Sequence, residues 1–260
     1  VPFGTNAAIR FRSNNTLDAG ETFSIDNVTI NAVFQQPANP PSVDIATSYV
    51  EDAAATSIAS LPRITDDGTT MASARIVLTN AFAGDQLTVS TALPAGISAT
   101  TATVGTTIVV TLNGTASIAA YQAAIQAIGY SSTSQNPNTT PRVIEVTVND
   151  GVFDSNVART TVAVTSVNDA PVANADTIFT NVTTAPFVVP EWALVANDVD
   201  VDAAALDITA VTVNTGSLGS VSLATNPGSV TVTDNAAPGG SFTYTVNDGS
   251  GAANATANAT

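Results

Sequence analysis

The sequence predicts an all-β protein built from β-sandwich domains in tandem, and three observations predict this fold class. Charged residues make up only 10% of the 260 residues, while the β-branched residues Thr and Val, which favour pleated strands, are abundant. Short segments that alternate apolar and polar residues are separated by turn-forming Gly, Pro, Asn and Asp. The tetrapeptide Val-Asn-Asp-Gly occurs at 148–151 and again at 246–249, which indicates a repeated structural unit.

The first 43 residues predict the end of a preceding domain and a linker. Residues 1–34 contain alternating segments at 8–12 and 22–30, which predict the terminal strands of a β domain. Their ending, Ile-Asp-Asn-Val at 25–28, resembles the closing strand of jelly-roll, carbohydrate-binding-like domains. Residues 35–43 contain three prolines and predict a semi-rigid Pro-rich linker.

Residues 44–170 predict the first complete β-sandwich, which contains one short helix. Helical spacing of Ile118, Tyr121, Ile125 and Ile128 predicts a helix packed on the core, with Ser117 as its N-cap and a stop at residue 129. The predicted strands are 73–79, 86–91, 107–112, 143–148 and 158–164.

Residues 171–260 predict a second sandwich, truncated in its last strand. We expect Trp192 and Tyr244 to be core residues rather than a ligand platform. The predicted strands are 177–180, 193–196, 206–213, 220–223, 229–233 and 241–246, with 252–260 beginning the last strand. Because the chain begins with Val1 and ends in this strand, we expect a fragment or a processed product.

The composition excludes several function classes. The chain has no Cys, no His and no Lys, which removes the commonest general base, the thiolate nucleophile and the Schiff-base amine, so we expect no enzyme. The net charge of −15 argues against nucleic acid and anionic membrane surfaces as partners. The sequence contains no run of about 18 apolar residues, so it predicts no membrane insertion. An acidic chain with oxygen ligands is suited to a hard cation, calcium above all, although solubility alone is the simpler reading of the charge.

Topology predicts where the acidic residues of the second sandwich meet. If successive strands alternate in direction, the loops at 197–202 and 247–248 lie at the end of the domain that the linker enters. Several uncompensated carboxylates would then converge, and a calcium ion would neutralise them. The candidate metal ligands are Asn168, Asp169, Asn197, Asp198, Asp200, Asp202, Asp248 and, from the first domain, Glu51.

Simpler readings remain for parts of this set. The Asp-Gly pairs at 150–151 and 248–249 are good hairpin turns without any ion. For Asp198, Asp200 and Asp202 the simpler reading is a solvated acidic loop. The loop at Asn149 and Asp150 is the weaker calcium case, because the linker before the first domain lacks an Asn-Asp pair.

Residues 44–260 resemble the bacterial cadherin-like and VCBS-type tandem repeats of large extracellular adhesins and matrix proteins. The motifs that carry the resemblance are Gly-Asp-Gln-Leu at 84–87, Leu-Asn-Gly-Thr at 112–115, Val-Asn-Asp-Ala-Pro at 167–171, Asn-Asp-Val-Asp-Val-Asp at 197–202 and Phe-Thr-Tyr-Thr-Val-Asn-Asp-Gly at 242–249. The resemblance implies Ig-like sandwiches strung end to end with calcium at the junctions. Residues 66–68, Asp-Asp-Gly, depart from the alternating acidic loop of the family.

These observations predict a structural spacer or adhesion module of an extracellular or cell-surface fibre, or of a biofilm matrix, stiffened by interdomain calcium. The expected partners are neighbouring like domains in the same chain, self-assembled filaments through open strand edges, and cell-surface glycans. Two alternatives stay open: a glycan-binding module, and an accessory region of a larger secreted hydrolase.

Overall fold

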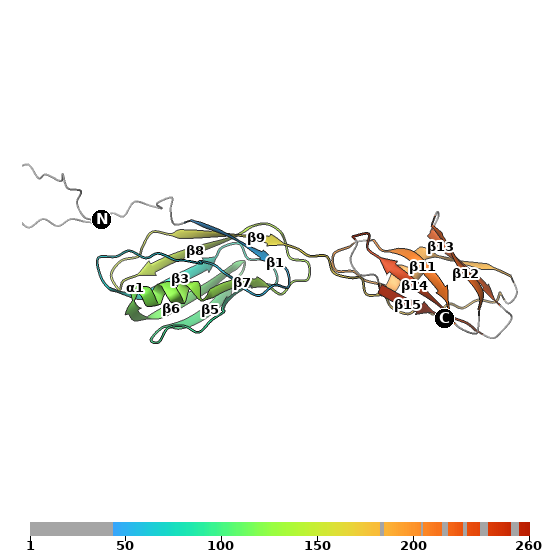
Figure 1. Ribbon diagram of the computed structural model, residues 1–260, viewed down its shortest axis with the longest axis horizontal. Helices are drawn as coiled ribbons and strands as arrows, with labels where there is room; N and C mark the ends of the chain where they lie inside the picture. Colours follow the sequence, from blue (N-terminus) through green and yellow to red (C-terminus); the bar gives the residue numbers. More distant parts are fainter. Residues whose placement is uncertain are drawn as a thin grey trace, which may run out of the picture. The chain divides into compact units, whose positions relative to one another are not determined.

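The computed structural model describes residues 44–260, except 183–184, 204, 215–217, 226–227, 235–238 and 251–254. Within this part the chain is mostly β and forms two sandwiches (Figure 1). The predicted jelly-roll-like strands at 1–34 and the linker at 35–43 lie outside the described residues. None of the helices in the described part is long and apolar enough to span a membrane.

The first sandwich packs a six-stranded sheet, in the order β1-β9-β8-β3-β6-β5, against a three-stranded sheet, β2-β7-β4. All neighbouring strands are antiparallel except β1 and β9, which run parallel. The strands are β1 (Ile45–Val50), β2 (Thr56–Ser57), β3 (Thr70–Leu78), β4 (Asp85–Val89), β5 (Ser98–Val104), β6 (Thr107–Ser117), β7 (Ile128–Ser132), β8 (Arg142–Asn149) and β9 (Ala158–Thr165).

The core of the first sandwich follows from the alternation of its strands. Inward residues of β3 and β6, such as Ile76, Val110 and Leu112, are fully buried and meet Ile128 and Tyr130 of the facing sheet. Each large apolar side chain that is removed from water in this way stabilises the fold by about 1.5–3 kcal/mol.

The predicted helix is present as α1 (Ile118–Gln126). Ser117 is its N-cap, as predicted, because its hydroxyl accepts a hydrogen bond of 3.2 Å from the amide of Ala120. Tyr121 and Ile125 are buried in the core, as the helical spacing predicted. The helix ends before the predicted stop, at the C-cap Ala127, and Gly129 already belongs to β7.

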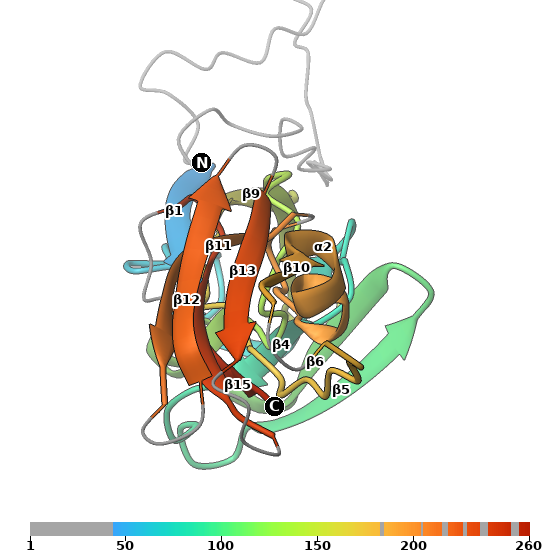
Figure 2. The same cartoon turned by 90° about the vertical axis from the view of Figure 1, so that its right-hand side faces the viewer.

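The second sandwich contains two three-stranded sheets, β10-β13-β12 and β11-β14-β15 (Figure 2). The strands are β10 (Phe187–Pro190), β11 (Asp207–Val213), β12 (Leu218–Thr225), β13 (Gly228–Asp234), β14 (Phe242–Asn247) and β15 (Ala255–Ala259). Alternate residues of β14, Phe242, Tyr244 and Val246, are buried and form the centre of a separate core with Ile208 and Val232. This alternation is the period of a strand that is buried on one face.

Two predicted strands are wrong. Residues 193–196 belong to a short helix α2 (Glu191–Leu194) and a following 3-10 helix η1 (Val195–Asn197). Pro190 is the N-cap of α2, and Glu191 and Ala193 favour a helix over a strand. The strand that precedes this helix is β10, which the sequence did not predict, whereas the predicted segment 177–180 has no strand.

Candidate metal centre

Three segments meet at one end of the second sandwich. They are the linker between the two sandwiches (residues 166–172), the loop after η1 (Val195–Asn197) and the hairpin after β14 (Phe242–Asn247). The backbones of Val172 and Val199 pair through two hydrogen bonds of 2.7 and 3.0 Å, which places the linker along the loop. Strand β11 begins opposite the end of β14, with Asp207 paired to Asn247, so the loop and the hairpin share an end. The predicted convergence of these segments is therefore present.

Hydrogen bonds join the linker to both of the other segments. The amide N–H of Asp169 donates to Oδ2 of Asp202 at 2.7 Å. The side-chain amide of Asn168 donates to Oδ2 of Asp248 at 2.5 Å. Four of the predicted ligands thus lie in one network, although they are up to 80 residues apart in the sequence.

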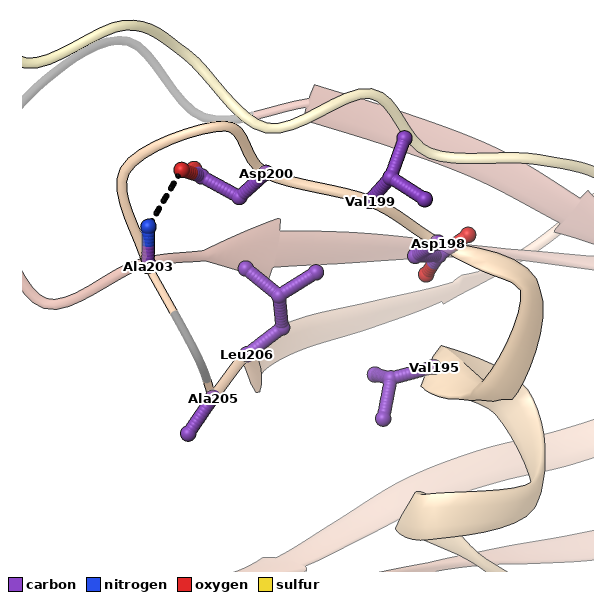
Figure 3. A pocket seen from close by; sticks show the side chains of 7 residues that line it. All are labelled: Val195, Asp198, Val199, Asp200, Ala203, Ala205 and Leu206. Atoms are coloured by element: carbon purple, nitrogen blue, oxygen red, sulfur yellow. Dashed lines mark hydrogen bonds between the residues drawn. The ribbon is translucent and has the colours of Figure 1, made fainter. Parts of the chain in front are cut away.

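Two carboxylate oxygens of this network are buried without a partner. Oδ1 of Asp200 accepts a hydrogen bond of 2.7 Å from the amide of Asp202 and one of 2.8 Å from the amide of Ala203, and these bonds shape the loop. Figure 3 shows the bond to Ala203. Oδ2 of Asp200 and Oδ2 of Asp169 are shielded from solvent and accept no hydrogen bond. An anionic oxygen that has lost water and gained no partner is costly, and a cation is one way of offsetting that cost.

The electrostatics of the network are uncompensated. Burial, and then repulsion by neighbouring carboxylates, that of Asp202 first, raises the pKa of Asp169 above its ordinary value. Hydrogen bonds from the backbone and hydroxyl of Ser250 and from Asn168 hold the pKa of Asp248 below its ordinary value. No Arg or Lys follows Arg159 in the sequence, so the second sandwich has no basic side chain to neutralise these groups.

Asn197 and Asp198 lie in a different network from the other predicted ligands. Asp198 is 8% exposed, and its Oδ1 accepts a hydrogen bond of 2.7 Å from the amide of Asn174. Burial is the main cause that raises the pKa of Asp198. The hydroxyl of Tyr244 donates toward the carbonyl of Asn174 and Oδ2 of Asp176, both at 2.8 Å. Asn197 donates to the carbonyl of Ala175 at 3.2 Å, so these residues hold the segment after the linker on the sandwich.

Glu51 lies at the end of β1 in the first sandwich, where the chain leaves β9. It is 5% exposed, and its Oε2 accepts hydrogen bonds from the hydroxyl of Ser166 at 3.0 Å and the amide of Val167 at 2.7 Å. Its Oε1 is buried and accepts none. Glu51 therefore has one oxygen committed to the chain just before Asn168 and one oxygen without a partner.

A shallow pocket adjoins the loop of the second sandwich, with a volume of about 440 Å³. Asp198 and Asp200 are at one side of it, and the other lining residues are apolar: Val195, Val199, Ala203, Ala205 and Leu206 (Figure 3). These walls offer no side-chain oxygen beyond the two carboxylates. Among the described residues, no three carboxylates are arranged closely enough around one point to enclose a metal ion.

The hairpin at the end of β8 has the same Asn-Asp-Gly sequence but uses its oxygens internally. Oδ1 of Asp150 accepts hydrogen bonds of 2.7 Å from the backbone amides of Val152 and Phe153, which lower its pKa. The side-chain amide of Asn149 donates to Oδ1 of Asp154 at 2.7 Å. Gly151 has a φ of +106°, a conformation that favours glycine. A plain turn accounts for this hairpin without an ion.

Three residues of the second sandwich were missed or misjudged by sequence reasoning. Trp192 was expected in the core but is 72% exposed on α2, whereas Tyr244 is fully buried as expected. Asn174 and Asp176, which complete the Tyr244 network, were not predicted as functional. Pro190 was the feature of the sequence that could have corrected the prediction for Trp192. Proline favours a helix start at Glu191, and on a helix Trp192 faces a different direction than it would on a strand.

A match to a family model agrees with the fold of the second sandwich. Residues 168–260 match the family model of the bacterial Ig domain, which confirms the Ig-like fold predicted from the sequence. The chain is also similar to an endo-fucoidan hydrolase, MfFcnA9 of glycoside hydrolase family 107, at 17% identity and a TM-score of 0.23, over 67% of this chain and 27% of that chain.

A second similar structure is mouse clustered PcdhgC3, domains EC1-3, at 11% identity and a TM-score of 0.34, over 84% of this chain and 65% of that chain. The chain thus spans less than two thirds of either protein. No curated protein matches the sequence.

Proposed function

We propose that this chain is a non-catalytic structural spacer of an extracellular or cell-surface protein, and that calcium stiffens the entry to its second sandwich. The observation that carries the proposal is the pair of buried, unpartnered oxygens on Asp169 and Asp200 in a domain without any basic residue. Hard oxygen donors of this kind fit calcium rather than zinc or copper, which favour Cys and His.

The residues that would hold the ion are Asp169, Asp200, Asp202 and Asp248, with the side-chain oxygen of Asn168, and the ion would have to draw these carboxylates closer together than they lie in the structure. They come from the linker, the loop and the hairpin, so a shared cation would tie three separate segments together. The bound ion would supply positive charge and orient these oxygens. Because the linker is one of the three segments, binding would restrict its movement relative to the second sandwich.

Glu51 connects this end of the linker to the first sandwich. Its hydrogen bond to Val167 fixes the residue just before Asn168, and its free oxygen is available to a cation. A structural module of a surface fibre or matrix gains from such a junction, since a stiff linker transmits orientation along the chain. The absence of His, Cys and Lys from the sequence supports a non-catalytic role.

Isothermal titration calorimetry of the full chain, stripped of metal with a chelator, tests this proposal. Calcium is expected to bind with release of few protons, and magnesium more weakly, because magnesium demands a near-ideal octahedral arrangement. No heat of binding with calcium, together with no change in thermal unfolding, would contradict it.

The exposure of Trp192 favours a second candidate function, glycan binding. An exposed indole offers a flat apolar face, and sugars present apolar faces to such surfaces. Native gel electrophoresis in soluble polysaccharides tests this candidate: retardation that Trp192→Ala removes would support it, and equal migration in every polysaccharide would contradict it.

A further inference from the structure

The first and last strands of the first sandwich are parallel neighbours. Strand β1 is at the edge of the six-stranded sheet and pairs with β9 from Ile45↔Thr160 to Val50↔Thr165 (Figure 1). The chain therefore enters the sandwich at the start of this ladder and leaves at its end. When the chain is drawn from both sides, β1 and β9 are pulled past each other along their own axes.

Side chains fix both ends of this ladder. At the start, Oδ1 of Asp44 accepts a hydrogen bond of 3.2 Å from the amide of Arg159. At the end, the amide of Glu51 donates to the carbonyl of Thr165 at 2.9 Å, and the Glu51 carboxylate accepts the amide of Val167 at 2.7 Å. The entering and the leaving chain are thus each tied to the opposite strand where tension would first act.

Tyr49 anchors β1 in the core. It is 2% exposed, its hydroxyl donates to the carbonyl of Ser132 at 3.0 Å, and its ring meets that of Tyr130 edge-on with centroids 5.4 Å apart. The hydroxyl of Tyr130 in turn donates to Asp85 at 2.6 Å. Sliding of β1 along β9 must therefore also withdraw a buried aromatic side chain from its contacts.

We propose that the β1–β9 ladder is a shear clamp that resists tension along the chain. Its hydrogen bonds lie across the direction of pulling and share the force, whereas a ladder that is opened from one end breaks its bonds in succession. This inference builds on the proposed role as a structural module, but it concerns the first sandwich alone and requires no calcium. Resistance to pulling is a property that a surface fibre needs and that an enzyme accessory region does not.

Pulling direction tests the clamp with both strands intact. The chain has no natural Cys, so paired Cys substitutions give unique attachment points for force spectroscopy on the full chain. V43C with V167C draws the ladder in shear, because these positions precede β1 and follow β9. V43C with V157C pulls on the same end of both strands and opens the ladder from there.

In chelator, the shear pair is expected to unfold at a several-fold higher force than the opening pair. Equal forces in the two directions would overturn the proposal. Because calcium is absent from this experiment, its outcome is independent of the metal site. A directional difference in a chain that binds no calcium would support the clamp and contradict only the calcium proposal. Calcium binding without a directional difference would contradict only the clamp.

A matched pair of proline substitutions tests the hydrogen bonds themselves. Amides that face the same neighbour recur at every second residue of a parallel strand. Since Glu51 donates to Thr165, the amide of Thr47 also faces β9, and that of Ser48 faces the open edge. Proline removes the amide hydrogen, so Thr47→Pro deletes a clamp bond and Ser48→Pro does not.

In the shear direction, Thr47→Pro is expected to lower the unfolding force markedly, while Ser48→Pro stays close to the parent chain. Equal losses in both variants would overturn the proposal. If circular dichroism shows that Thr47→Pro does not fold, the comparison of the two pulling directions decides the question by itself.

Discussion

The side-chain amide of Asn168 donates a hydrogen bond to the carboxylate of Asp248, which joins the linker to a hairpin 80 residues later in the sequence. In the same linker, the backbone amide of Asp169 donates a hydrogen bond to the carboxylate of Asp202, so adjacent linker residues hold two loops of the second sandwich. Between these contacts lie carboxylate oxygens without partners, on Asp169 and Asp200.

Asp200→Asn is expected to abolish calcium binding without unfolding the loop. The Asn Oδ1 can still accept the amides of Asp202 and Ala203, while the unpartnered oxygen is replaced by an amide group that repels a cation. Calorimetric titration with calcium measures the loss. Asp154→Asn, in the first-sandwich hairpin, is the matched control and should bind as the parent does; equal loss in both variants would show that the site is elsewhere.

Without calcium, mild acid should stabilise the second sandwich. The pKa values of Asp169, Asp198 and Glu191 are raised above their ordinary values, each chiefly by burial. A carboxyl with a raised folded-state pKa binds its proton more tightly when folded, so stability is lost as pH rises from its ordinary pKa, about 4, through the raised value. Denaturant unfolding in chelator should therefore show higher stability at about pH 5 than at about pH 7.

The stabilisation by mild acid should end below about pH 4, and calcium binding should weaken as the pH falls. The lowered pKa of Asp248 means that stability from this group falls as pH drops below about 4. Calcium competes with protons for the carboxylates, so its stabilising effect should shrink as the pH is lowered toward about 5. A calcium effect that is equally large at both pH values would contradict this linkage.

Arg142→Met should strongly destabilise the first sandwich. Arg142 and Asp85 form an ion pair of 2.6 Å whose side chains are both 0% exposed, and Phe82 lies over the guanidinium at 4.4 Å. Removing one partner leaves a buried charge, which costs about 3–5 kcal/mol. Arg159→Met breaks a partly exposed pair with Glu145 and should cost less than about 1 kcal/mol. Urea unfolding measures both, and equal effects would contradict the distinction.

The convergence of the acidic loops could be predicted because it depends only on strand alternation. Once β11 and β14 are antiparallel, residues before Asp207 and after Asn247 must share an end. The division of the loop into two networks could not be predicted. It depends on whether Asp198 faces the Tyr244 hydroxyl or the linker, and a shift of one residue exchanges these directions.

The short strands and α2 show where local pattern fails. Apolar residues at 193–196 fit a strand or a helix equally well over so few positions, and Pro190 together with tertiary packing of Leu194 favours the helix. Strand β1 was missed because its sequence, Ile-Ala-Thr-Ser-Tyr-Val, does not alternate apolar and polar residues, and at the edge of the sheet only Tyr49 is buried. The parallel pairing of β1 with β9 is a tertiary feature that no local pattern predicts.

Thermal unfolding of the full chain with calcium and with chelator tests the central claim most directly. If calcium binds the folded second sandwich, a concentration of about 100 times its Kd should stabilise that sandwich by about 2.7 kcal/mol, which raises its midpoint by about 10–20 °C. Asp200→Asn should remove this shift. Identical unfolding curves with calcium and with chelator in the parent chain would contradict the claim.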